Sequence, residues 1–356
     1  MMTSAKQINR FFLLATGPLL GLLIALLIGG AGGIDWSRSP ESFAPETDIP
    51  QMAGNIGQQL DNAESAAKLT AASIKETTDL YQMTTTTISA IVTSAQQTAK
   101  QPETIYNKRI TKKLGTPYQT IQSDKIRIEL YKVNPGTYKG YAMKVKLKSP
   151  DAMKMTLGKD KLGGAETTLR AVERHGAVAG INAGGFADSG GKRYPLSTTM
   201  LNGKYLTGFQ PTYKDLFFVG MSKSGKLIGG KFKKQSDLDK LDPSFGASFV
   251  PILLKNGVKT AIPKKWQTSP LRAPRTVIGN YKDDQLLVLV IDGRDENGSS
   301  GATLTELQSK LFNMGVQNAY NLDGGGSSSL VVNGRVVNKP SDGQLRPVPT
   351  HFLFFK

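Results

Sequence analysis

Polar and charged residues follow several apolar segments of this 356-residue chain, at points where each segment gives way to glycine or a turn. These places are 182–186, 275–276, 292–294, 321–328 and 338–346. Glycine lets backbone N–H groups approach a ligand closely and accepts dihedrals that other residues avoid. One such segment is typical of an ordinary turn. Five in one region predict that strand ends converge on a common rim, where carboxylates, guanidinium groups and amides form a site.

The residue types that are missing restrict the chemistry of this site. The sequence has no cysteine and only two histidines, His175 and His351. Thiol catalysis, disulfides, cysteine-based zinc sites and iron–sulfur clusters are therefore excluded, as is a metal held by three histidines. An enzyme of this composition has to work with carboxylates, arginine, lysine, amides and hydroxyls. His351, in the last apolar segment, is expected to be structural.

The positive charge lies in the C-terminal part of the chain. Lysine and arginine number 45 against 28 aspartates and glutamates, a formal charge of +17, and residues 117–356 alone carry +16. Such a field favours a phosphate-bearing substrate or a polyanionic envelope polymer, with general attraction to an anionic surface as the alternative. No nucleic-acid-binding motif is visible, so nucleic acid is not an expected partner.

Residues 1–34 predict a membrane anchor. Lys6 and Arg10 precede a stretch, 11–34, without a charged residue, which is long enough to cross a bilayer. Acidic residues prevail directly after it, so the positive-inside rule places the N-terminus in the cytoplasm. A cleaved signal peptide is the alternative. The sequence thus predicts a single-pass cell-membrane protein whose C-terminal domain is extracytoplasmic, on a bacterial surface.

Residues 35–116 predict a linker followed by a helical stalk. Between Ile56 and Thr98, apolar or small residues recur at alternating steps of four and three, which is a heptad pattern. Threonine and alanine occupy many of these positions, so the seam is weak. Three interpretations remain: a bare spacer, a helix that self-associates through 56–98, or a mostly disordered linker, since 84–87 is a run of threonine.

Residues 117–356 predict a mixed α+β domain. Apolar segments of strand type lie at 126–133, 141–148, 177–182, 216–221, 248–254, 275–281, 286–291, 317–322 and 351–355. Asn-Gly pairs indicate hairpins within 198–206 and 330–337. Helices are expected at 166–175 and 303–314. The predicted architecture is a mixed β-sheet with a few packed helices, preceded by a transmembrane helix and the stalk.

The order of the polar motifs resembles the phosphodiester glycosidase family, some of whose bacterial members are labelled exopolysaccharide-biosynthesis proteins. The motifs are Arg275-Thr, Asp292-Gly-Arg294, Thr303-Leu-Thr-Glu306, Asn321-Leu-Asp-Gly-Gly-Gly-Ser-Ser328 and Pro340-Ser-Asp-Gly with Arg346. The resemblance covers roughly 125–356. It implies a hydrolase that cleaves a sugar from a sugar-1-phosphodiester, requires no cofactor and acts on an anionic glycan or glycopolymer.

That reaction expels a phosphate monoester, a weak base, so a general acid matters less than in ordinary glycoside hydrolysis. It needs positive charge around the phosphate and a carboxylate near the anomeric carbon. Planar guanidinium groups bind phosphate oxygens in pairs, and the expected phosphate-binding residues are Arg275, Arg294 and Arg346. Asp323 is the first choice for the catalytic carboxylate and Asp292 the second; either aspartate could instead brace an arginine.

Glu306 is the third candidate for a catalytic carboxylate. It is also the third residue of a capping box that begins at Thr303, and whether it faces the site is open. The other expected substrate-binding residues are Asn182, Asn321, Gly324, Gly325, Ser327 and Asp342. Ser327 and Ser328 lack a nucleophile-elbow context and are expected to shape the backbone or donate hydrogen bonds. A divalent cation among Asp292, Asp323 and Asp342 is also left open.

Two other functions remain alternatives. One is a non-catalytic or transferase-like factor that binds an envelope polysaccharide during its assembly. The other is a stalked, adhesin-like module whose basic face binds the cell wall.

Overall fold

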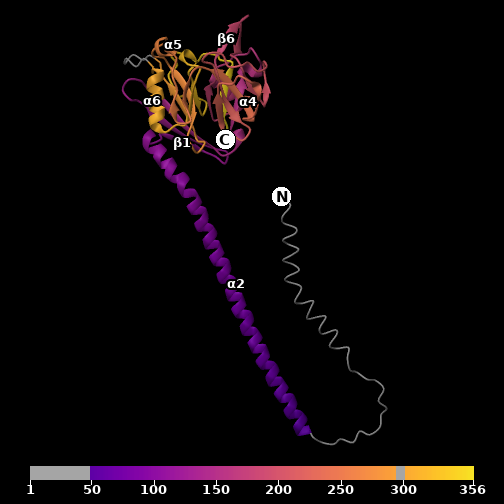
Figure 1. Ribbon diagram of the computed structural model, residues 1–356. Helices are drawn as coiled ribbons and strands as arrows, with labels where there is room; N and C mark the ends of the chain where they lie inside the picture. Colours follow the sequence, from indigo (N-terminus) through magenta and orange to yellow (C-terminus); the bar gives the residue numbers. More distant parts are fainter. Residues whose placement is uncertain (1–48, 294–300) are drawn as a thin grey trace, which may run out of the picture. The chain divides into compact units, whose positions relative to one another are not determined.

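The computed structural model describes residues 49–293 and 301–356 (Figure 1). The predicted anchor, most of the linker before the stalk, and Arg294 lie outside the described residues. In the described part of the chain, no helix is both long and apolar enough to cross a membrane. The chain divides into two compact units, residues 1–91 and 92–356.

The predicted stalk helix is confirmed and is longer than its heptad pattern. Helix α2 runs over Ile49–Leu114, beyond both ends of 56–98. Its threonines fit because their hydroxyls bond within the helix: Thr70 donates to the carbonyl of Ala66 and Thr77 to that of Ser73, each at 2.8 Å. The disordered alternative is therefore wrong for 49–114.

The domain contains three main antiparallel sheets. The large sheet has the order β1 (Gln119–Gln122), β2 (Ile126–Val133), β3 (Gly140–Leu147), β16 (Leu286–Ile291), β15 (Arg275–Asn280), β17 (Asn318–Leu322), β13 (Ile252–Lys255), β14 (Val258–Lys259). The second sheet has the order β19 (Arg335–Val336), β18 (Leu330–Val332), β5 (Ala179–Asn182), β20 (Thr350–Phe354), β4 (Met153–Leu157). The third has the order β11 (Leu227–Gly230), β10 (Phe217–Ser222), β12 (Pro243–Phe249), β8 (Met200–Leu201), β9 (Lys204–Tyr205).

The smaller elements surround these sheets. A separate hairpin consists of β6 (Phe186–Ser189) and β7 (Lys192–Pro195). The helices are α3 (Thr168–His175), α4 (Gln235–Asp239), α5 (Lys264–Thr268) and α6 (Leu304–Met314), with single 3₁₀ turns at Pro150–Ala152, Gly158–Asp160 and Gly325–Ser327. The mixed α+β class is thus confirmed, with few helices and antiparallel pairing throughout the described strands.

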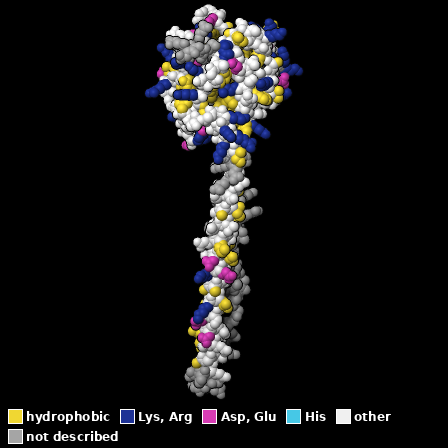
Figure 2. Space-filling view, turned by 90° about the vertical axis from the view of Figure 1, so that its left-hand side faces the viewer, with side chains coloured by type: hydrophobic (Ala, Val, Ile, Leu, Met, Phe, Trp, Pro, Cys, Tyr) yellow, Lys and Arg dark blue, Asp and Glu magenta, His cyan; other side chains and the backbone are white. Residues whose placement is uncertain are grey.

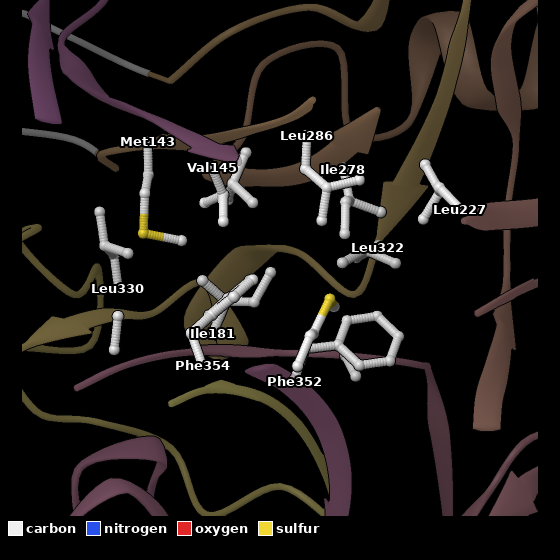
Figure 3. Close-up of a cluster of buried hydrophobic side chains, with 14 of the residues drawn as sticks. Met143, Val145, Ile181, Leu227, Ile278, Leu286, Leu322, Leu330, Phe352 and Phe354 are labelled. Carbon is white, nitrogen blue, oxygen red and sulfur yellow. The ribbon is translucent and has the colours of Figure 1, made fainter. Parts of the chain in front are cut away.

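The main hydrophobic core lies between the large sheet and the other two (Figure 3). Alternate strand residues point to one face of a sheet, so one side of each strand can enter this core. From the large sheet come Met143, Val145, Ile278, Leu286 and Leu322; from the second sheet come Ile181, Leu330, Phe352 and Phe354. Strand β5 lies in the second sheet, and β15 and β17 are neighbours in the large sheet that faces it. This packing therefore brings the ends of the three strands together.

A second core covers the other face of the large sheet. Helix α6 packs there through Leu307 and Leu311, and the last turns of α2 add Ile110. A buried ion pair supports the same contact: the Lys144 ammonium lies 2.5 Å from a carboxylate oxygen of Glu129 and donates to the Asn107 amide oxygen of α2 at 2.6 Å. The end of the long helix is therefore part of the folded domain.

Most predicted elements agree with the structure within two residues, and one is wrong. The segment 248–254 is two strands in different sheets, β12 and β13, and not a single strand. Pro251 lies between them and has no N–H to continue a ladder, which explains the interruption. The strands β1, β4, β11 and β14, the hairpin β6–β7 and the short helices α4 and α5 were not predicted.

Replacing Ile110 by alanine tests whether the end of α2 is a structural part of the domain. Ile110 is 3% exposed, so Ile110→Ala should lower the free energy of unfolding by about 2–4 kcal/mol through lost burial and a cavity. Ile105, 52% exposed on the same helix, is the matched control, and Ile105→Ala should change stability by less than about 0.5 kcal/mol. Urea unfolding monitored by fluorescence would measure both; equal effects would contradict the docking of α2.

Candidate active site

Asp323 follows β17 directly, and hydrogen bonds of its backbone groups fix its position. Its N–H donates to the carbonyl of Ala183 at 3.1 Å, and its carbonyl accepts the amide of Asn182 at 2.6 Å. Its carboxylate oxygen Oδ1 accepts the N–H of Gly324 at 3.0 Å. These contacts join the end of β17 in the large sheet to the end of β5 in the second sheet.

Asn182 is fully buried, and its side chain forms hydrogen bonds at this junction between the ends of β5 and β17. Its amide oxygen accepts the hydroxyl of Thr276 at 2.8 Å and the N–H of Ser329 at 3.1 Å. Together with the bond to Asp323, these contacts connect four segments. Asn182 is an expected substrate-binding residue, and in the structure its side chain makes these three hydrogen bonds inside the protein, which position Asp323.

The three positions after Asp323 favour glycine, because a side chain would clash with neighbouring atoms at two of them and the third has a left-handed backbone conformation. A Cβ on Gly324 would lie 2.9 Å from the carbonyl oxygen of Pro274, and a Cβ on Gly326 would overlap the Asp342 carboxylate and the Arg346 guanidinium. Gly325 has a φ of +60° and donates its N–H to Pro274 at 2.9 Å. The predicted convergence of strand ends is therefore confirmed for 275–276, 321–328 and 338–346.

Unpartnered polar atoms concentrate beside Asp323. Eight buried side-chain oxygen or nitrogen atoms in the described residues have no hydrogen-bond partner. Four of them belong to one segment: Asn321 Oδ1, Asp323 Oδ2, Ser327 Oγ and Ser328 Oγ. Buried polar atoms are nearly always paired in folded proteins, so a cluster of unpaired ones is typical of a place that a ligand or water completes.

The carboxyl group of Asp323 is difficult to ionise. Burial raises its pKa from 3.8 to about 6, although Ser327, the Gly324 N–H, Arg346 and Arg193 favour the charged form. The Ser327 hydroxyl favours the ionised carboxylate, although Ser327 Oγ and Asp323 Oδ2 do not form a hydrogen bond of ordinary geometry. A carboxylate whose pKa is near neutrality can exchange protons during a reaction, so Asp323 fits a catalytic role.

Arg346 supplies positive charge at the site. Its guanidinium donates to Asp342 at 2.7 Å, and the two side chains are 38% and 42% exposed. The Arg346 guanidinium holds the pKa of Asp342 below its usual range. Asp342 therefore orients Arg346 over the glycines.

Arg275 is buried and separate from this pair. Its guanidinium donates to the carbonyls of Pro270 at 3.0 Å and Ala302 at 3.4 Å. Burial lowers its pKa to about 10, which still leaves it charged at neutral pH. No carboxylate in 49–293 or 301–356 pairs with it. Among the described residues, the guanidinium of Arg275 is thus held by backbone carbonyls alone.

The other two predicted carboxylates act on the scaffold. Glu306 completes the predicted capping box of α6, accepting the Thr303 N–H at 2.8 Å, and it also pairs with Arg272 at 3.1 Å. Arg272 also donates to the other oxygen, Oε1, at 3.1 Å, so Glu306 is not a free carboxylate. Asp292 accepts the Lys339 N–H at 2.7 Å and so attaches the 338–346 loop to the end of β16.

Asn321 is also buried, with its amide donating to the carbonyl of Val250 at 2.6 Å. Its unpaired oxygen is the atom left for another partner. Asp292, Asp323 and Asp342 do not form a metal cluster, and no group of three or more histidine or acidic side chains suited to a cation occurs in the described part of the chain.

Sequence reasoning missed the effect of Arg193 on Asp323 and the polar contacts that connect His351 to the site. Arg193, on strand β7, is one of the charges that act on Asp323. Behind Asn182, His351 contacts the Thr168 hydroxyl at 3.2 Å, and that hydroxyl lies 2.6 Å from the hydroxyl of Ser329. Burial lowers the pKa of His351 to about 3, so its expected structural role fits a neutral imidazole. In the sequence, only the Gly-Gly pair at 190–191 indicates a turn between β6 and β7. Nothing in the sequence indicates that this hairpin acts on Asp323.

A cavity of about 650 Å³ lies elsewhere in the domain. It is formed by β4 and the ends of β8, β10 and β12, and none of the predicted site residues lines it. The position of the motifs and the unpaired atoms around Asp323, rather than cavity size, identify the candidate active site.

Replacing Asp323 by asparagine should stabilise the fold in a pH-dependent way. Because the folded-state pKa is about 6 and the ordinary value is 3.8, ionisation of Asp323 opposes folding above that window. Asp323→Asn should therefore raise the free energy of unfolding by about 2–3 kcal/mol at pH 8 and leave it unchanged at pH 3. Urea denaturation at both pH values measures this; an equal change at both would show that the carboxyl is not desolvated.

Comparison with known proteins extends this description. The phosphodiester glycosidase family model matches residues 175–355. N-acetylglucosamine-1-phosphodiester alpha-N-acetylglucosaminidase of Bos taurus is 31% identical over 137 residues, which is 35% of this chain and 26% of that protein. An uncharacterized SPbeta prophage-derived protein of Bacillus subtilis is 30% identical over 186 residues, 51% of this chain and 28% of the other. This chain thus spans about a quarter of the length of these relatives.

Solved structures show the same fold. The catalytic domain of the zebrafish N-acetylglucosamine-1-phosphodiester alpha-N-acetylglucosaminidase, auto-inhibited by its pro-peptide, has a TM-score of 0.53 at 21% identity, over 68% of this chain and 86% of that one. A hypothetical protein from Synechocystis has a TM-score of 0.50 at 14% identity, over 68% and 64%. At these identities the likeness concerns the fold alone. Because the family model covers half of the sequence, including Asp323 and Arg346, this chain belongs to the phosphodiester glycosidase family.

Proposed function

We propose that the domain hydrolyses a sugar-1-phosphodiester and releases the sugar together with a phosphomonoester. The observation that carries this proposal is the carboxylate of Asp323, which has an unpartnered buried oxygen, a pKa near 6 and two arginines nearby. Membership of the phosphodiester glycosidase family supports the same class of reaction.

In this reaction the bond between the anomeric carbon and the phosphate oxygen breaks, and its electrons leave with the phosphate. Asp323 acts on the anomeric carbon, either as the nucleophile or as the base that takes a proton from the attacking water. Arg346, fixed by Asp342, stabilises the charge that develops on the departing phosphate. Arg275, which pairs with no carboxylate in the described part of the chain, contributes a further positive charge.

The pH dependence of hydrolysis tests the role of Asp323. A nucleophile or base has to be ionised, so kcat/KM should rise about tenfold per pH unit below pH 6 and level off above it. Asp323→Asn should lower kcat by about a thousandfold or more, whereas Asp237→Asn, which changes an exposed carboxylate on helix α4, should leave it unchanged. Release of sugar from N-acetylglucosamine-1-phosphodiester, named in the relatives, is the first assay.

Two results would contradict this proposal. One is full activity in the folded Asp323→Asn variant. The other is binding of a phosphodiester-containing glycan without release of sugar at any pH, which would favour the non-catalytic or transferase-like assembly factor.

The proposed substrate is carried by an anionic glycopolymer of the cell envelope or by an exopolysaccharide. The formal charge of +17 supports an anionic partner, and Figure 2 shows more basic than acidic side chains over the visible face of the domain. In this proposal residues 1–34 hold the protein in the cell membrane, and the domain acts outside it. A basic surface raises the local concentration of a polyanion around the site.

The proposal includes self-association through the seam of α2. Ile74 and Ile88 lie on the seam and are 62% and 56% exposed, which leaves apolar surface for a second helix. The internal bonds of Thr70 and Thr77 support this arrangement, because these threonines can then present their methyl groups to a partner.

A single lysine on the seam tests the association. Ile88→Lys should convert a concentration-dependent dimer or trimer of 49–356 into a monomer, because like charges would face each other. Leu80 is the matched control, since it is 58% exposed but lies off the seam, and Leu80→Lys should not change the mass. Sedimentation equilibrium measures both variants; a monomeric wild-type protein at all concentrations would remove the self-association proposal.

A further inference from the structure

The hairpin β6–β7 is built onto the candidate active site from a segment outside the three sheets. It begins directly after Asn182-Ala-Gly-Gly and is attached at its base by the N–H of Leu196, which donates to Gly185 at 2.9 Å. The N–H of Arg193 donates to the carbonyl of Gly163 at 3.3 Å. In Figure 1, β6 extends beyond the main sheets at one end of the domain.

The position of this hairpin is imposed by glycine. A Cβ on Gly184 would lie 2.6 Å from that of Ala247, and a Cβ on Gly185 would overlap the ring of Phe249. The segment therefore packs directly against β12 before it turns out into the hairpin. Because Asn182 holds Asp323 two residues earlier, the hairpin and the carboxylate are placed by the same short segment.

The guanidinium of Arg193 is held in one orientation. It lies 4.7 Å from the centre of the Phe186 ring, and its Nε donates to Asp188 at 3.1 Å. Its Nη1 donates to the carbonyl of Pro347, the residue after Arg346. Two of the five guanidinium N–H groups are thus used, and in the described part of the chain the other three have no partner.

Arg193 on strand β7 and Arg346 in the 338–346 loop therefore come from adjoining segments beside one carboxylate. Each has a single carboxylate brace, Asp188 for Arg193 and Asp342 for Arg346. Both arginines stabilise the charge of Asp323. The Arg193 side chain is 29% exposed, so solutes can reach it.

We propose that Arg193 binds the substrate phosphate together with Arg346, and that the hairpin β6–β7 thereby selects substrates with an anionic leaving group. This inference deepens the proposed function and rests on it. Two preoriented guanidinium groups from separate segments match the several oxygens of a phosphate, because each can donate two parallel hydrogen bonds. A sugar with a neutral leaving group has no partner for them.

The rival explanation is that Arg193 only pins the hairpin to the 338–346 loop through Pro347. A glutamine at position 193 separates the two roles, since its amide can still donate to that carbonyl while the charge and the planar fork are lost. Lys192 on the same strand is the matched control: Lys192→Gln removes an equal charge from the hairpin but none of the contacts described for Arg193.

The kinetic test compares two substrates that share one sugar. Arg193→Gln should lower kcat/KM for the sugar-1-phosphodiester at least about thirtyfold, and that for the corresponding nitrophenyl glycoside less than about threefold. Lys192→Gln should change neither by more than about threefold. Equal losses on both substrates, or no loss on the phosphodiester, would overturn the inference.

Binding of inorganic phosphate tests the inference without catalysis. Isothermal titration of the wild-type protein should detect phosphate, and Arg193→Gln should weaken this binding at least about tenfold, with Lys192→Gln unaffected. Phosphate binding that depends on Arg193 in a protein that hydrolyses nothing would keep the inference and reject the proposed function. No phosphate binding by the wild type, or binding that does not depend on Arg193, would refute it. If Arg193→Gln fails to fold, Arg193→Lys replaces it and should retain weakened phosphate binding.

Discussion

The hydrogen bond between the Asn182 amide and the Asp323 carbonyl connects the two halves of the site. Asn182 ends a strand of the second sheet, and Asp323 follows a strand of the large sheet. The sheets are held together by the apolar side chains between them, but apolar packing does not fix a backbone to a fraction of an ångström. A buried amide with three directed bonds does, because leaving any of them unmade costs about 1–3 kcal/mol.

This junction explains why the surrounding polar groups tolerate their environment. With the backbone of Asp323 fixed, its side chain stays in a poorly solvated place and its pKa remains high. The glycines that follow then allow Arg346 and Asp342 to lie directly on the chain. Burial of the Asp323 carboxyl costs stability, and it leaves an unusually basic carboxylate near Arg346 and Arg193. Perturbed pKa values of this kind are common at catalytic sites.

Much of the domain could be predicted from sequence because its local signals agree with its tertiary structure. The strands β2 and β16 coincide with their predicted bounds, since their apolar runs are buried and end in turns. The segment 248–254 failed because a proline divides it between two sheets. Asp323 and Arg346 could be identified from motifs that adjoin glycine, a property of the chain itself.

The remaining site residues could not be assigned because their roles depend on distant neighbours. Asn182 looks like a sugar ligand in sequence, and only the positions of Thr276 and Ser329 show that its side chain is occupied. Arg193 carries no motif at all; it reaches the site because Gly184 and Gly185 pack on β12. The raised pKa of Asp323 likewise follows from burial, which spacing along the chain does not reveal.

The burial of His351 has a consequence for a protein exposed to mild acid. Between pH 6.5 and about 3, the unfolded chain takes up a proton on this imidazole that the folded chain refuses, so acidification weakens the fold. Asp323 behaves in the opposite sense between about pH 6 and 3.8, where the folded chain retains a proton that the unfolded chain releases. Across that interval the two proton balances offset each other. The histidine and the carboxylate together therefore contribute a weaker pH dependence to the stability of the domain in this interval than either group alone.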